Sequence, residues 1–333
     1  MESRAQMIKK INKKSVAGAL LLVFLLSIFF VGCTVADEQR LDDDNAAEGD
    51  VYYTFTDDLG NEVVLAEKPE RVAVLFSSFA EVWQCAGGMV DITVGESVER
   101  GFADASAVLV DDGAGKTINT EVLIAAKPDF VICSADVEAQ VKTADFLRDV
   151  GVPVACFHVE VFSEYMNMLE ICTDITEDKE GYAENGTAVA ENVEAMLNAV
   201  KEKDALCDEI LFVRAGSGAS ATKAKRAEDH FAAAMLAQLG TKNIADDVPV
   251  LLDGLSIEEI LRSDPDAIFI STMGDADAAK AHMNSVLSQP AWQALTAVQN
   301  RNVYYLPKEL FQFKPNARWD DAYEYLIDIV YGK

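Results

Sequence analysis

The chain has 333 residues, half of them hydrophobic, which is enough apolar material for two compact lobes, each with its own core. Its formal net charge of -28 argues against a nucleic-acid partner, because so acidic a surface repels a polyanion.

Residues 1–32 have the pattern of a lipoprotein signal peptide. A lysine-rich segment precedes the uncharged run 15–32, which ends in Val31-Gly32 before Cys33. Small residues before a cysteine at the end of such a run are typical of bacterial lipoproteins, in which the cysteine becomes the first residue and carries lipid such as palmitate. Phe30 stands where leucine is usual, and an uncleaved membrane anchor is the alternative. With either anchor, the rest of the chain is expected on the extracytoplasmic face of the cell membrane.

An acidic segment follows the anchor. Residues 33–50 contain the lipid-bearing Cys33 and the sequence TVADEQRLDDDNAAEGD, which has many acids and no apolar periodicity. Such a composition cannot bury a core, so the segment is predicted to be a disordered tether.

The Gly-Lys-Thr sequence at 115–117 raises the possibility of a phosphate-binding loop. That loop needs a glycine five places before the Gly-Lys-Thr unit, and Val110 occupies the place. Asn119, shortly after it, is predicted to cap the start of a helix. The pattern therefore predicts a loop that leads into a helix, without nucleotide chemistry.

An internal repeat indicates two related lobes. Residues 119–135 (NTEVLIAAKPDFVICSA) align without a gap on 256–272 (SIEEILRSDPDAIFIST), at an offset of 137 positions. Each copy has a capping residue, an acid two places later (Glu121 or Glu258), a Pro-Asp turn and a buried strand. A single repeat of this length is typical of two lobes of similar architecture rather than of a solenoid.

Short apolar runs alternate with helical patterns along the whole chain. This alternation predicts two parallel sheets covered by helices, one in residues 51–175 and one in 206–333. Between them, residues 176–205 carry apolar residues at helical spacing and are predicted to be a long connecting helix. The predicted strands are 71–76, 130–133, 152–157, 209–213, 267–270 and 303–306.

Five cysteines follow Cys33. Their number is odd and none forms a CxxC pair, so they are predicted to be buried free thiols rather than a disulfide framework.

Ligands of open α/β sheets bind beyond the carboxyl ends of the strands, and this rule selects the candidate binding residues. A basic cluster, 214–226, stands out against the acidic chain and could recognise an anion through charged donors. Phenylalanines at 76, 79, 311 and 313 could pack on the apolar body of a ligand. The predicted ligand-binding residues are Phe76, Ser77, Ser78, Glu160, Arg214, Ser217, Lys223, Lys225, Met273, Phe311 and Lys314.

Each of these features has an alternative role. Ser78-x-x-Glu81 also fits a helix capping box, Phe311 also fits a core position, and the basic cluster also fits a solvated loop. Three histidines without metal-ligand spacing give no reason to predict a metal site, although His158 lies near Glu160 at a strand end. No G-x-S-x-G sequence is present, and neither catalytic residues nor a cofactor are predicted.

Four stretches in order resemble the class III substrate-binding proteins of ABC importers, over residues 53–333. They are 56–75 (TDDLGNEVVLAEKPERVAVL), 119–132, 256–270 and 291–306 (AWQALTAVQNRNVYYL). The resemblance implies two Rossmann-like α/β lobes joined by one long α-helix. It also implies a non-enzymatic receptor that captures a ferric siderophore, haem or a corrinoid and delivers it to a permease dimer with its ATPase. In that family one surface glutamate on each lobe docks on permease arginines, and Glu121 and Glu258 match those positions. The alternatives are a receptor for a free transition-metal ion and a secreted two-lobed enzyme.

Overall fold

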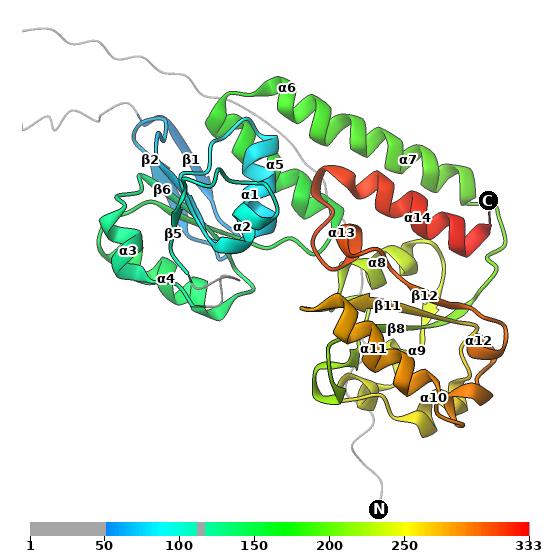
Figure 1. Cartoon of the computed structure of the whole chain (residues 1–333). Coiled ribbons are helices and arrows are strands. Elements are labelled where there is room, and N and C mark those ends of the chain that lie inside the picture. Colours follow the sequence, from blue (N-terminus) through cyan, green and yellow to red (C-terminus); the bar gives the residue numbers. More distant parts are fainter. Residues whose placement is uncertain (1–50, 112–116, 333) are drawn as a thin grey trace, which may run out of the picture. The chain divides into compact units, whose positions relative to one another are not determined.

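The computed structural model describes residues 51–111 and 117–332 (Figure 1). The predicted signal peptide, Cys33, the acidic tether and most of the Gly-Lys-Thr loop lie outside the described residues. The described chain begins with an antiparallel hairpin of β1 (Tyr53–Thr56) and β2 (Glu62–Leu65).

The first sheet is parallel throughout, in the order β5-β4-β3-β6-β7. Its central strands are buried on both faces, as the continuous apolar runs predicted. The strands are β3 (Val72–Val74), β4 (Ile92–Thr93), β5 (Val108–Leu109), β6 (Phe130–Ser134) and β7 (Val154–Phe157). The helices are α1 (Ser77–Cys85), α2 (Gly95–Glu99), α3 (Thr120–Ala125), α4 (Glu138–Asp149) and α5 (Phe162–Thr176).

The second sheet has the order β10-β8-β11-β12, again parallel, with β9 antiparallel to β8. Its strands are β8 (Glu209–Ala215), β9 (Lys223–Ala224), β10 (Lys242–Asn243), β11 (Ala267–Thr272) and β12 (Val303–Tyr305). Its helices are α8 (Phe231–Gln238), α9 (Ile244–Asp247), α10 (Ile257–Ser263), α11 (Ala276–Leu287), α12 (Thr296–Gln299), α13 (Lys308–Phe311) and α14 (Trp319–Tyr331). The predicted two-lobed α/β fold is confirmed.

One helical segment runs between the two sheets in the chain. It consists of α6 (Lys179–Tyr182), one π-helical turn (Ala183–Thr187) and α7 (Ala188–Val200). The C-terminal α14 lies alongside α7, and Asn192 donates a hydrogen bond to Asp320 at 2.8 Å (Figure 1). The chain's last helix therefore supports the connection.

The Pro-Asp turns of the repeat have a shared structural role. The Asp129 carboxylate accepts hydrogen bonds from the backbone N–H groups of Glu70 and Arg71, directly before β3. The Asp266 carboxylate accepts from the N–H groups of Asp208 and Glu209, at the start of β8. In both lobes the aspartate thus fixes the beginning of the neighbouring central strand, which explains why the motif occurs twice.

The two capping residues of the repeat, Asn119 and Ser256, differ in their hydrogen bonds. Asn119 caps α3 by accepting a hydrogen bond from the Val122 N–H at 3.1 Å, as predicted. Ser256 stands at the N-cap position of α10, but its side chain makes no capping hydrogen bond. The five described cysteines are free thiols, four of them buried, which confirms that prediction.

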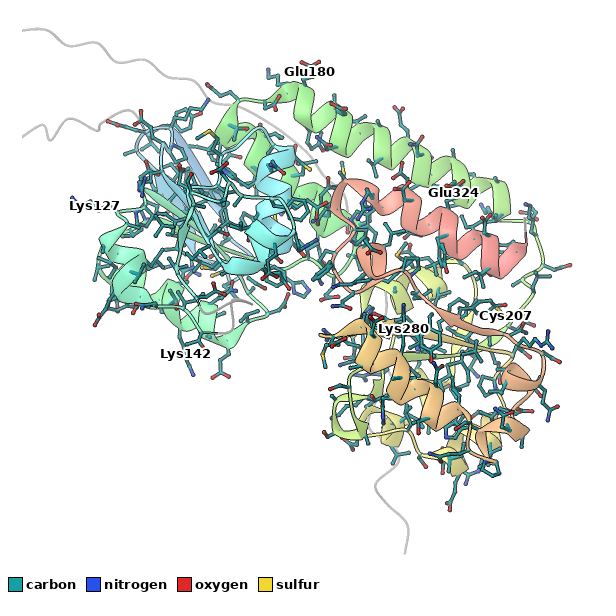
Figure 2. All side chains as sticks on the ribbon, viewed as in Figure 1. Lys127, Lys142, Glu180, Cys207, Lys280 and Glu324 are labelled. Carbon is teal, nitrogen blue, oxygen red and sulfur yellow. The ribbon has the colours of Figure 1, made fainter. Side chains whose placement is uncertain are left out.

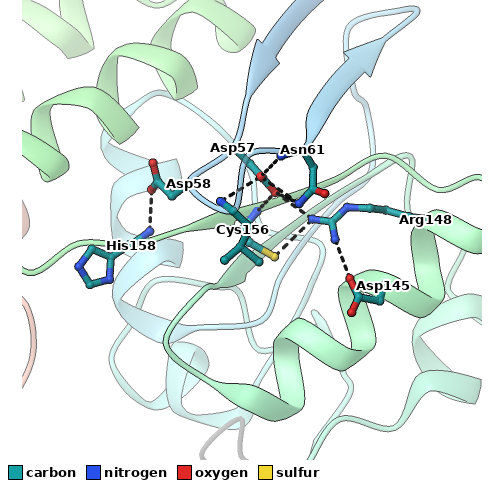
Figure 3. A network of polar contacts seen from close by, with 8 residues as sticks. Asp57, Asp58, Asn61, Asp145, Arg148, Cys156 and His158 are labelled. Atoms are coloured by element: carbon teal, nitrogen blue, oxygen red, sulfur yellow. Dashed lines mark hydrogen bonds and ion pairs between the residues drawn. The ribbon is translucent and has the colours of Figure 1, made fainter.

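A buried carboxylate holds the N-terminal hairpin on the first sheet (Figure 3). Asp57, whose side chain has no exposed surface, accepts hydrogen bonds from the N–H groups of Leu59 (3.1 Å), Asn61 (2.8 Å) and Cys156 (3.1 Å). Arg148 of α4 adds an ion pair at 2.8 Å. One side chain therefore ties together the hairpin turn, strand β7 and helix α4.

Candidate functional site

A cavity of about 420 Å³ lies where the carboxyl ends of strands from both sheets meet. Most lining segments follow the end of a parallel strand, as the rule for open α/β sheets predicts, and residues 229–231 lie at the start of α8 (Phe231–Gln238). The first sheet contributes Phe76, Ser77, Ser78, Glu96 and Glu160. The second contributes Arg214, Asp229, His230, Phe231, Met273, Gly274, Lys308, Gln312, Phe313 and Lys314.

Seven of the eleven predicted ligand-binding residues line this cavity. They are Phe76, Ser77, Ser78, Glu160, Arg214, Met273 and Lys314. These residues span positions 76 to 314 of the chain, so the two sheets bring them together.

The other four predicted residues lie outside the lining. Phe311 is fully buried in the core, stacked at 6.5 Å on Phe231. Ser217 lies exposed beyond the end of β8, and Lys223 lies in β9 opposite Arg214. The carbonyl of Lys225 accepts a hydrogen bond from Asn243, which holds that backbone against the sheet. The basic cluster therefore contributes Arg214 alone to the lining.

Sequence patterns missed Glu96, which follows a strand of two residues, and the pair His230-Phe231, which begins α8. The sequence signal that could have indicated the pair is the position of His230 directly before an apolar helical run, where a capping residue is expected. His230 does cap α8, because its Nδ1 accepts a hydrogen bond from the Ala232 N–H at 3.2 Å.

The cavity has cationic groups without acid partners. Arg214 makes no side-chain hydrogen bond or ion pair within the described part of the chain, and the same holds for the exposed Lys308. Burial lowers the pKa of Arg214, and the negative charge of Glu160 opposes that effect. A guanidinium taken out of water without hydrogen-bond acceptors is unfavourable unless a ligand supplies them.

The three acids of the lining are already engaged. Glu96 accepts a hydrogen bond from the Ser77 hydroxyl at 2.5 Å, and Asp229 pairs with Arg226 at 2.7 Å. Glu160 forms a close ion pair with Lys314. These bonds leave Arg214 and Lys308 available to an incoming anion.

His230 supplies a neutral polar group. Burial lowers its pKa well below the usual value, and the positive charges of Arg214 and Lys314 act in the same direction. Because Nδ1 accepts from Ala232, the proton of the neutral ring is on Nε2. The ring also stacks on Phe231, with centroids 4.8 Å apart. His230 and Phe231 thus present an aromatic wall to the cavity.

A polar network holds the lining residues that the first lobe contributes. Arg100 donates hydrogen bonds to the hydroxyls of Ser77 (3.0 Å) and Ser78 (3.2 Å) and pairs with Glu81 at 3.3 Å. Asn316, from the chain's C-terminal segment, donates to Glu81 and to the Ser78 carbonyl, both at 2.8 Å. Ser78 and Glu81 therefore do not form a capping box. Helix α1 begins at Ser77 with Phe76 at its N-cap position, and the buried Glu81 instead pairs with Arg100 and Asn316.

The aromatic side chains of the site also hold Arg100. Its guanidinium lies 4.7 Å from the ring centre of Phe102 and 4.0 Å from that of Phe313. Phe313 lines the cavity, whereas Phe79 is buried in the core. Of the four predicted aromatic contacts, Phe76 and Phe313 are thus available to a ligand.

Glu121 and Glu258 lie in the first turns of α3 and α10, and both are exposed. Neither has a hydrogen bond or an ion pair with another described residue. Three positions later, Ile124 and Leu261 are also equivalent in the repeat, and each is 39% exposed. Each lobe therefore presents an acid and an aliphatic side chain at neighbouring helical positions.

A second cavity of about 440 Å³ lies at the opposite end of the first sheet. Its lining includes Arg71, Asp91 and Val108, which precede or begin strands. Arg71 already donates a hydrogen bond to the Ala126 carbonyl. This cavity lacks residues from the second sheet and lies away from the carboxyl ends of the strands, so the first cavity is the better candidate.

In residues 51–111 and 117–332, no group of three or more histidine, cysteine or acidic side chains could hold a metal ion. No helix in them has both the length and the apolar character needed to cross a bilayer. His158, the histidine singled out at a strand end, bonds to Asp136 at 2.6 Å.

Comparison with known proteins agrees with the α/β fold. The model of a family described as periplasmic binding protein matches residues 72–310. YhfQ of Bacillus subtilis (strain 168), whose name describes an ABC transporter substrate-binding lipoprotein, is 22% identical over 316 residues, which cover 89% of this chain and 91% of YhfQ.

Solved structures share the fold. Staphylococcus aureus SirA, complexed with staphyloferrin B, has a TM-score of 0.63 at 20% identity, covering 83% of this chain and 96% of SirA. S. aureus IsdE, complexed with heme, has a TM-score of 0.63 at 14% identity, covering 78% of this chain and 98% of IsdE.

Proposed function

The chain belongs to the periplasmic binding protein family, and from this premise we propose that it is the extracytoplasmic substrate-binding lipoprotein of an ABC importer. It captures an anionic iron complex, a ferric siderophore or haem, in the cavity between the two sheets and delivers it to a permease dimer with its ATPase. A corrinoid is the further candidate cargo. The observation that carries the proposal is a cavity with two cations that lack acid partners, Arg214 and Lys308, beside the rings of Phe76, Phe231 and Phe313.

The chemistry of the lining supports an anionic, partly apolar cargo. Arginine and lysine bind carboxylate or phenolate oxygens, and aromatic rings pack on the planar or apolar part of a ligand. The names of the relatives point the same way, since they describe a transporter lipoprotein, a complex with staphyloferrin B and a complex with heme.

The cargo can be identified directly. We expect mass spectrometry of the purified protein, after growth with limiting iron, to find one co-purified small molecule. Calorimetric titration with haem, ferric catecholates, ferric citrate and corrinoids would then rank the classes. A protein that binds none of these compounds, or that converts one into product, would contradict the proposed function.

The anchor gives a prediction about lipid attachment. Cys33→Ser is expected to abolish it, because the serine hydroxyl does not replace the thiol in lipid transfer. Incorporation of labelled palmitate, followed by gel analysis, measures this. Labelling of the serine variant at the wild-type level would contradict the anchor at Cys33.

Docking on the permease gives a second prediction. Reversing both Glu121 and Glu258 to lysine is expected to reduce uptake by the intact importer several-fold and to leave cargo affinity unchanged. Both glutamates are exposed and unpaired on equivalent helices, so the change removes two charges that could orient the complex and replaces them with repulsive ones.

A matched control has the same change in net charge. Glu180→Lys with Glu324→Lys reverses two exposed acids on α6 and α14. These helices differ from α3, which carries Glu121 and whose end is marked by Lys127 (Figure 2). Transport assays in cells should show normal uptake for this pair. Equal uptake by both double variants would leave Glu121 and Glu258 with only their favourable interaction with the helix dipole, about 0.3–1 kcal/mol each.

A further inference from the structure

We propose that the Glu160 carboxylate occupies the position in the cavity that an anionic group of the cargo takes, so that a cargo reaches Lys314 only by displacing Glu160. This inference rests on the proposed function and adds a residue that determines specificity. It makes Glu160 a competitor of the cargo rather than a contact to it.

The contacts of Glu160 carry the proposal. Among the three acids of the lining, Glu160 is the one that pairs with a cation of the lining, Lys314. Both side chains are largely removed from solvent, with 12% of Lys314 and 30% of Glu160 exposed. The charge of Glu160 also acts on Arg214, the cation without a hydrogen-bonded partner. One carboxylate therefore pairs with one cation of the lining and shares the cavity with a second.

The backbone around Glu160 is held independently of its side chain. The N–H groups of Glu160 and Val161 both donate to the Glu164 carboxylate, at 2.6 Å and 2.9 Å. These bonds hold the start of α5 and do not involve the Glu160 side chain. The carboxylate can thus leave Lys314 without breaking either of them.

Displacement would also change the link between the two sheets. Glu160 follows β7 of the first sheet, and Lys314 follows β12 of the second. A second link, from Asn316 to the Ser78 carbonyl, does not involve the displaced group. Binding therefore removes the Glu160–Lys314 connection and leaves the hydrogen bonds of Asn316 to the Ser78 carbonyl and to Glu81 in place.

The selectivity follows from counting charges. A cargo with one anionic group binds Arg214, whose donors are otherwise unsatisfied, and leaves Glu160 on Lys314. A cargo with two anionic groups also reaches Lys314, but only by displacing Glu160. Charge-assisted bonds of this kind are the strong ones, so Glu160 lowers the affinity that the second anionic group adds.

The test uses metal-free citrate as the probe and Glu160→Gln as the variant. Glutamine keeps the shape of the side chain and removes the competing charge. We expect calorimetry to show at least tenfold tighter citrate binding by Glu160→Gln than by wild type, and a smaller gain for acetate. As a control, Glu309→Gln removes an exposed acid next to Lys308 that does not line the cavity, and its citrate affinity should stay within twofold of wild type.

A double-mutant cycle locates the effect. In a Lys314→Met background, adding Glu160→Gln should raise citrate affinity less than threefold, because the cation for which Glu160 and citrate compete is absent. Thermal melts show whether each variant folds. Weaker citrate binding by Glu160→Gln than by wild type would overturn the proposal and make Glu160 a direct contact of the cargo. Equal binding, or none by either protein, would overturn it as well. Failure of the proposed function would show separately, as a cargo that is neither an iron complex nor a corrinoid, since citrate binding is measured without metal.

Discussion

Asp57→Ala is expected to lower the free energy of unfolding by about 3–5 kcal/mol, the range found when one partner of a buried ion pair is removed. The Asp57 side chain is fully buried and accepts hydrogen bonds from three backbone N–H groups and from Arg148 (Figure 3). Alanine leaves the three N–H groups without this acceptor and leaves the guanidinium with its exposed partner Asp145 and the Cys156 sulfur. Each unsatisfied buried group adds to the loss, because water cannot reach it to replace the bond.

Denaturation with urea, followed by circular dichroism, measures this change. Asp145→Ala is the matched control, because Asp145 pairs with the same Arg148 at 3.1 Å but is 69% exposed. An exposed pair contributes about 0–1 kcal/mol, so the control should be nearly neutral. If the two variants lost similar stability, the position of Asp57 under the hairpin would not have the structural role assigned to it.

Arg214→Gln is expected to weaken cargo binding by roughly tenfold to 150-fold, which corresponds to the 1.5–3 kcal/mol of a hydrogen bond to a charged group. Arg214 lines the cavity, and it has no hydrogen bond or ion pair with any residue that the structure describes. Its donors are therefore available for the cargo and contribute nothing comparable to the fold.

The same reasoning predicts a second readout for this variant. Burial lowers the pKa of Arg214, so the folded protein holds a charge under unfavourable conditions, and replacing it should leave the melting temperature unchanged or raise it. Calorimetric titration with the identified cargo and a thermal melt test both points. Arg262→Gln serves as the control, because Arg262 is 73% exposed and pairs with Glu259 on α10. A variant that loses stability but keeps full affinity would show that Arg214 is a structural residue.

Local patterns in the sequence were sufficient to predict the scaffold. Continuous apolar runs predicted strands buried on both faces, and helical spacing predicted the segment between the two sheets. The repeat predicted two lobes, because a Pro-Asp turn fixes the neighbouring strand by bonds to Asp129 in one copy and to Asp266 in the other. These features depend on neighbouring residues or on short-range geometry, which a sequence displays directly.

The strand-end rule found seven lining residues for a similar reason. In parallel sheets, the carboxyl ends of the strands meet at one edge, so identifying the strands also identifies the loops that share that edge. The rule could not separate side chains that enter the cavity from those that turn away. Phe311, for example, lies in the core beneath Phe231, because the chain folds α13 against the sheet.

Only the tertiary structure decided which charges are available. The sequence alone determined two parallel α/β lobes and the loops that meet at their strand ends. It could not show that Glu81 pairs with Asn316, 235 positions away, or that Glu160 meets Lys314, 154 positions away. A charged side chain is paired or available according to what lies within a few ångströms in space, and bonds of this range depend on how the whole chain folds.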